Sequence, residues 1–160
     1  KHIMKAFYNA IKLHIQTKIP QVLHIDLWND QLNNLEDENQ FARPAIFIEL
    51  DTVQWATSKN SKKGTVNFIL HLVTDCYDNR ADDTYAIEAL DKVDETEEQF
   101  DGHKMENCTP FENTSTTIDN NHGNLIENLL GYSCEYTKCI TRGKKFVEVE
   151  PNLKVEGEFK

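Results

Sequence analysis

Two stretches of alternating apolar and polar residues constrain the fold of this chain more than any other feature of its sequence. Over 45–53 the two sides of a pleat carry Ile46, Ile48 and Leu50 against Phe47, Glu49 and Asp51. Over 65–75 one face carries Val66, Phe68, Leu70 and Leu72. The basic, small-residue segment 56–64 between them predicts a protruding turn, so we expect an antiparallel pair of strands.

Two helices accompany these strands. Residues 4–19 place apolar side chains at helical spacing, and Pro20 ends the pattern. A second helix is expected after the capping candidates at 78–80, with Asp82 and Asp83 in its first turn and its end before Gly102. Its predicted apolar stripe consists of Ala86, Ala89, Leu90, Val93 and Phe100.

The remaining segments predict further strands and loops. Residues 22–28 and 129–140 indicate strands, 105–118 an exposed or edge strand, 29–42 a long loop and 119–123 a turn. The sequence therefore predicts an α+β fold: an antiparallel or mixed sheet of about four to five strands with two amphipathic helices packed on one face. We expect 1–3 to be an expression remnant, 4–140 a single domain and 141–160 an extended C-terminal tail.

Charge and composition argue against several classes of function. The 160 residues carry a formal net charge of −10, which argues against binding to nucleic acid or to an anionic membrane. The sequence shows neither a long apolar run nor a signal-peptide pattern, so we expect a cytoplasmic protein whose four cysteines are reduced.

The sequence contains no strong motif for a metal site, a catalytic nucleophile or a phosphate-binding loop. His103, Cys108, His122, Cys134 and Cys139 invite a zinc interpretation, but their spacing fits no zinc motif. Cys76 near His71 is the best nucleophile candidate, yet an offset of five on a strand points the two to opposite faces. The glycines form no phosphate-binding loop. We therefore predict no catalytic residues, no metal, no cofactor and no enzymatic activity.

Charged and aromatic residues offer candidate subunit contacts. The candidates are a basic loop of Lys59, Lys62 and Lys63, an acidic helix face of Asp91, Asp94, Glu95 and Glu98, and the tryptophans Trp28 and Trp55. A head-to-tail contact between the basic loop and the acidic face would generate a ring. The simpler alternatives are a soluble turn, a solvated helix face and core tryptophans.

The order of elements resembles that of the tail-terminator, or tail-completion, proteins of long-tailed bacteriophages and prophages. The residues that carry the resemblance are KIPQV at 18–22, RPAIFIEL at 43–50, VNFILHLVTD at 66–75 and YSCEY at 132–136. It covers 4–140. The long loop at 29–42 and the tail after 140 depart from the pattern of the family.

The resemblance implies a structural role. Such proteins form a ring, usually a hexamer, that caps the tail tube and faces the neck, and they have neither activity nor cofactor. It implies partners among tail-tube and neck proteins, and a location in the host cytoplasm and then in the virion tail. The alternative is a small cytoplasmic binding module that uses the open face of its sheet for a ligand or a protein partner.

Overall fold

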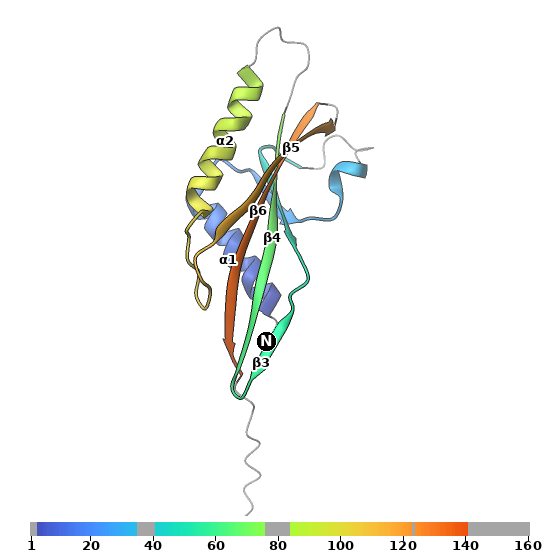
Figure 1. Cartoon of the computed structure of the whole chain (residues 1–160). Helices are drawn as coiled ribbons and strands as arrows, with labels where there is room; N and C mark the ends of the chain where they lie inside the picture. The colour runs from blue at the N-terminus through green and yellow to red at the C-terminus, as the bar shows by residue number, and fades with distance from the viewer. Residues whose placement is uncertain (1–2, 35–40, 76–83, 123, 141–160) are drawn as a thin grey trace, which may run out of the picture.

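A mixed sheet with both helices on one face forms the protein (Figure 1). The computed structural model describes residues 3–34, 41–75, 84–122 and 124–140. Their elements are α1 (Ile3–Lys18), β1 (His24–Leu27), the 3₁₀ turn η1 (Gln31–Asn34), β2 (Ala45–Leu50), β3 (Trp55–Ser58), β4 (Ser61–Asp75), α2 (Thr84–Phe100), β5 (Glu112–His122) and β6 (Leu125–Cys139). The predicted α+β class is confirmed.

The sheet is organised around its two longest strands. Its order is β1-β2-β4-β6-β5, with β3 added to the far half of β4. β1 and β2 run parallel, and every other pair is antiparallel. β4 and β6 pair over their whole length, from Ser61 opposite Cys139 to Asp75 opposite Leu125. The end of this pair that carries β3 extends away from α2 (Figure 1).

The main core lies between the sheet and the helices. α1 contributes Phe7, Ile11 and Ile15, which recur at the spacing of one helical face. An aromatic group joins the layers: Phe68 of β4 lies edge-on to Phe7 at 5.6 Å and stacks on Tyr132 of β6 at 5.5 Å. These contacts hold α1 across the centre of the sheet.

The segment 56–64 departs from its prediction. It is not a protruding turn but a tight hairpin, in which β3 and β4 pair directly and only Lys59 and Asn60 separate them. A Cβ at Gly64 would lie 2.8 Å from the ring of Trp55, so the glycine permits the close approach of β3. This extra strand brings the sheet to six strands, slightly more than predicted.

Other expectations need smaller corrections. In α2, Ala89, Val93 and Phe100 are buried as predicted, but Ala86 and Leu90 are exposed; Leu90 follows the buried Ala89 and lies on a flank of the helix that faces away from the core. Residues 119–122 continue β5 instead of forming a turn, since they lie opposite the start of β6. α1 begins at Ile3, so one residue of the expected remnant 1–3 is helical. The helix-capping candidates at 78–80, Asp82 and Asp83, Cys76 and the 141–160 tail lie outside the described residues.

Candidate functional site

The face of the sheet opposite the helices carries a second, smaller core. The chain that follows β1 folds over this face and brings Leu32 of η1 against Phe47 of β2, with Trp28 and Phe41 packed beside them. Ala45, Val73 and Leu125 complete the cluster. Trp28, Leu32 and Phe41, which belong to the connection between β1 and β2, therefore cover part of the face that the sequence predicts to be open for a ligand.

His71 lies under this cover, between two carboxylates. Its Nδ1 bonds to Glu127 of β6, and its Nε2 lies 2.6 Å from Oε2 of Glu49 on β2. The register explains the geometry: Phe47 and Leu129 stand directly opposite His71, and each glutamate is two residues away from one of them. The three side chains are thus diagonal neighbours on one face of three adjacent strands.

Burial makes this cluster more than a surface ion pair. The side chains of His71 and Glu127 are only 3% and 5% exposed, whereas that of Glu49 is 42% exposed. The ring of Trp28 stacks on the imidazole at 3.9 Å, with the two planes only 6° apart. One buried carboxylate, one hydrated carboxylate and an aromatic cover therefore enclose a single imidazole.

The geometry of the cluster favours a structural role. Both ring nitrogens lie within hydrogen-bond distance of a carboxylate oxygen, so both have partners inside the protein. The two carboxylates approach opposite sides of the ring, so they do not converge on a common ion. The cluster instead links β2, β4 and β6 and seats Trp28.

A second contact attaches the other end of the connection between β1 and β2 to the sheet. Arg43, just before β2, lies with its Nε 2.5 Å from Oδ1 of Asp75 at the end of β4. The guanidinium also lies 5.9 Å from the centre of the Phe41 ring. The two ends of the cover are thus fixed to the sheet, one by Trp28 on His71 and the other by Arg43 on Asp75.

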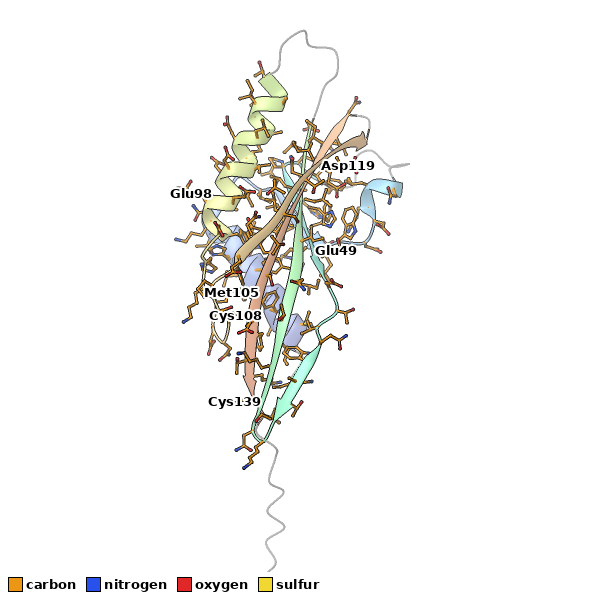
Figure 2. The ribbon with its side chains drawn as sticks, in the orientation of Figure 1. Glu49, Glu98, Met105, Cys108, Asp119 and Cys139 are labelled. Carbon is orange, nitrogen blue, oxygen red and sulfur yellow. The ribbon has the colours of Figure 1, made fainter. Side chains whose placement is uncertain are left out.

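Beside Glu49 the uncovered part of this face is hollowed. A polar depression of about 350 Å³ is lined by Glu49, Asp51, Asn67, Ile69, Thr114 and Ser115, among others. Figure 2 shows Glu49 and Glu98 on opposite sides of the long strands, so this depression is separated from the helix layer.

The residues of the zinc interpretation do not assemble. Cys108 and Cys134 come together beside the bridge of Cys108 to Tyr136; their mutual hydrogen bond lowers the pKa of Cys108 and raises that of Cys134. Cys139 lies near the far end of β6 (Figure 2), and His103 stacks on His14. The side chain of His122 is outside the described residues. Among the side chains that are described, no group of three or more His, Cys, Asp or Glu could hold a metal ion.

The predicted basic loop lies at the tip of the β3–β4 hairpin. Lys59 is exposed in the turn, while Nζ of Lys63 lies 3.1 Å from Oε2 of Glu135 and Nζ of Lys62 lies 5.2 Å from the centre of the Trp55 ring. Trp55 also lies edge-on to Tyr136 at 6.2 Å. Two of the three lysines and Trp55 thus have contacts within their own subunit.

The predicted acidic face divides between two flanks of α2. Glu95 accepts a hydrogen bond from Gln21 at 2.6 Å and faces α1. Asp91, Asp94 and Glu98 are exposed. The structure therefore brings the basic loop and the acidic face to different ends of the molecule (Figure 1), where they cannot meet within one subunit.

Sequence reasoning missed the His71 cluster. Trp28 was a candidate contact, and Glu49 was placed on the mixed face of its strand, but Glu127 carried no signal. The signal available was a histidine in the middle of the alternating stretch 65–75, on the side of the pleat away from the apolar row. Only the register of β4 with β2 and β6 identifies its two partners.

Comparison with known proteins does not assign the chain. No protein family model matches it, and no match is found among curated proteins. Separately, neither described helix is long and apolar enough to cross a membrane. The arrangement of the elements and the geometry above are therefore the basis for a functional assignment.

Proposed function

We propose that this protein is a structural subunit of the bacteriophage tail-terminator type, which forms a ring that caps the tail tube and joins it to the neck. The observation that supports this most is the order of the elements within one mixed sheet. A helix, a strand, a long connection, the antiparallel strands β2 and β4, a second helix and two closing strands follow one another as the resemblance implies, with the short strand β3 added between β2 and β4.

The chemistry of the sheet face fits a structural subunit. Its most organised polar cluster has both nitrogens of His71 engaged with carboxylates and the ring covered by Trp28. A buried histidine held in this way joins the three strands β2, β4 and β6. The same cluster holds Trp28, at the start of the connection between β1 and β2, on the sheet.

In the proposed role, the partners are further copies of this chain, then tail-tube and neck proteins. The assembly is a homo-oligomeric ring, usually of about six copies in proteins of this type, and closed rings arise from head-to-tail contacts. The protein would assemble in the host cytoplasm and end in the virion tail.

A second candidate function is a binding module. The polar depression beside Glu49, of about 350 Å³, favours it, because its volume is within the range of small-molecule sites. Its exposed carboxylates, amide and hydroxyls suit a small cationic or polyhydroxyl ligand. This candidate needs no self-association.

Electron microscopy of the purified protein separates the two. The proposed function predicts closed rings with a central channel, and it predicts that the gene lies among genes for capsid, portal and tail-tube proteins. Monomeric particles at every concentration, together with a gene among metabolic genes, would contradict it and favour the binding module.

A further inference from the structure

Exposed apolar side chains gather at the two opposite edges of the sheet. Six large hydrophobic side chains are among the exposed residues, and five of them lie at an edge: Leu23 and Leu27 at β1, and Ile87, Leu90 and Ile118 at β5 and the adjoining helix α2. β1 and β5 are the two ends of the strand order. Unpaired strand edges beside apolar side chains are surfaces that proteins ordinarily cover.

The surface at the β5 end, here called the α2 edge, combines Leu90, Asp94 and Ile118 with Ile87 and Glu98 of the adjoining outer face of α2. Thr116 of β5 donates a hydrogen bond to Glu97 of α2 at 2.6 Å, which fixes the helix above this strand. Ile118 lies two residues beyond Thr116, on the same side of the strand. Leu90 lies seven residues before Glu97, which places it on the same flank of the helix, whereas Ile87, ten residues before Glu97, lies about 80° farther round on the outer face.

The other flank of α2 is already occupied. His14 of α1 lies with its Nε2 2.7 Å from the carbonyl oxygen of Gln99, and Gln21 donates to Glu95. The α2 edge therefore faces away from α1 of the same subunit, and within the described part of the chain no element covers it.

The surface at the β1 end, here called the α1 edge, combines Lys5, Lys12, Leu23 and Leu27. Tyr8 lies on the flank of α1 opposite His14, which contacts α2, and it packs against the core together with Val22 and Ile25 of the β1 end, so this flank lies toward β1. Burial and then the carboxylate of Asp26 in β1 raise the pKa of Tyr8, in agreement with this position. Nζ of Lys12 lies 5.9 Å from the centre of the Tyr8 ring. Lys5, seven residues earlier, is on the same flank.

The two edges carry opposite charge. α1 contains three lysines and no carboxylate, whereas α2 contains six carboxylates and one lysine. Two copies that met through their α2 edges would bring carboxylates against carboxylates, which is unfavourable. The charges favour contact between an α2 edge and an α1 edge.

The strand directions are compatible with the same contact. β1 runs parallel to β2, and three antiparallel pairings separate β2 from β5, so β1 and β5 run in opposite directions. Copies related by rotation about an axis along the strands would place β5 of one against β1 of the next as an antiparallel pair. A contact between two different surfaces of this kind generates a ring where the rotation between neighbouring copies closes.

We propose that the α2 edge of one subunit binds the α1 edge of the next copy of this chain, which continues the sheet from β5 to β1 around a ring. This inference rests on the proposed ring function and names the contact that forms it. The basic tip at Lys59, Lys62 and Lys63 is the competing contact, because it is the other basic surface that the sequence predicts for the acidic face of α2.

Charge reversal with rescue tests the contact. One variant carries Lys5→Glu and Lys12→Glu, a second carries Asp94→Lys and Glu98→Lys, and a control carries Lys59→Glu and Lys63→Glu. Sedimentation velocity over a range of protein concentrations measures assembly. Each edge variant alone is expected to need at least about tenfold more protein for half-assembly, because reversed charges repel the edge they should bind.

An equimolar mixture of the two edge variants is expected to assemble like the wild type, since each edge again meets an edge of opposite charge, and the tip variant is expected to assemble normally. Restored assembly in the mixture also shows that both variants are folded. If the wild type assembles and the edge variants do so equally well, or only the tip variant fails, the edge contact is wrong and the ring function stands. If the wild type never assembles, both are wrong.

Discussion

The two faces of the sheet are held by different forces. The helix face buries aromatic and aliphatic side chains, with Phe7, Phe68 and Tyr132 in mutual contact. The opposite face has a small apolar cluster around Phe47, and beside it His71 is held between carboxylates under the ring of Trp28. Apolar burial is insensitive to protonation, whereas a buried charged cluster stabilises only while each charge has its partner.

This difference indicates that one face of the sheet stabilises the fold and the other positions a single connection. The helix face contains most of the buried area and thus most of the stabilisation of the domain. The contacts on the opposite face fix the positions of Trp28, Leu32 and Phe41, which belong to the connection between β1 and β2. Substitutions on the first face should therefore unfold the protein, and those on the second should loosen one connection before they unfold it.

The largest effect is expected from Phe68→Ala. Phe68 is fully buried at the centre of the aromatic group, so its truncation leaves a cavity and should cost about 3–5 kcal/mol of unfolding free energy in urea titrations. Leu13→Ala is the control: Leu13 is 63% exposed on α1, and its loss should change stability by less than about 0.5 kcal/mol. Equal losses in the two variants would contradict the assignment of the core to this face.

A slightly smaller loss is expected from Glu127→Ala. Removal of one partner leaves His71 buried with one fewer acceptor, which should cost about 3 kcal/mol. The half-exposed Glu49 is the matched control, and Glu49→Gln should cost less than about 1 kcal/mol.

The fluorescence of Trp28, measured in a Trp55→Phe background, should shift toward that of a hydrated indole in Glu127→Ala. This is expected because the imidazole on which the indole stacks is then less firmly held. Loss of stability without a change around Trp28 would show that the cluster does not seat the connection.

The smallest effect concerns pH and the helix layer. Burial, the neighbouring His14 and Lys18 lower the pKa of His103 from the ordinary value of 6.5. The folded state thus takes up this proton at lower pH than the unfolded chain. The contribution of His103 to stability is complete above pH 6.5 and is lost as pH falls toward the lowered pKa.

Replacement by phenylalanine should remove this part of the pH dependence, since the ring can still lie against Phe111. Thermal midpoints from about pH 7.5 to about pH 5 should therefore fall less in His103→Phe than in the wild type. Parallel curves for the two proteins would show that His103 titrates as it does in the unfolded chain.

The sequence predicts the helix face better than the opposite face, for a physical reason. Periodicity records which side of an element is apolar, so 4–19, 45–53 and 65–75 reveal the main core directly. Their pairing depends on long-range register, which periodicity does not record.

Because periodicity does not record register, the predictions for 56–64 and 119–122 are wrong, and the His71 cluster is not predicted. Small and charged residues at 56–64 and the Asn-rich run at 119–122 favour turns locally, yet both pair along the long strands. The pairing of Glu127 with His71 spans 56 positions in the chain, so nothing local indicates it.

The mass of the protein in solution tests the central claim most directly. Light scattering on a sizing column, over a range of protein and salt concentrations, gives this mass without reference to shape. A ring built by contact between the two edges predicts one discrete species near six times the subunit mass of 18.5 kDa, without a continuous series of larger polymers. A mass of 18.5 kDa at every concentration and salt would contradict the ring and the function proposed from it.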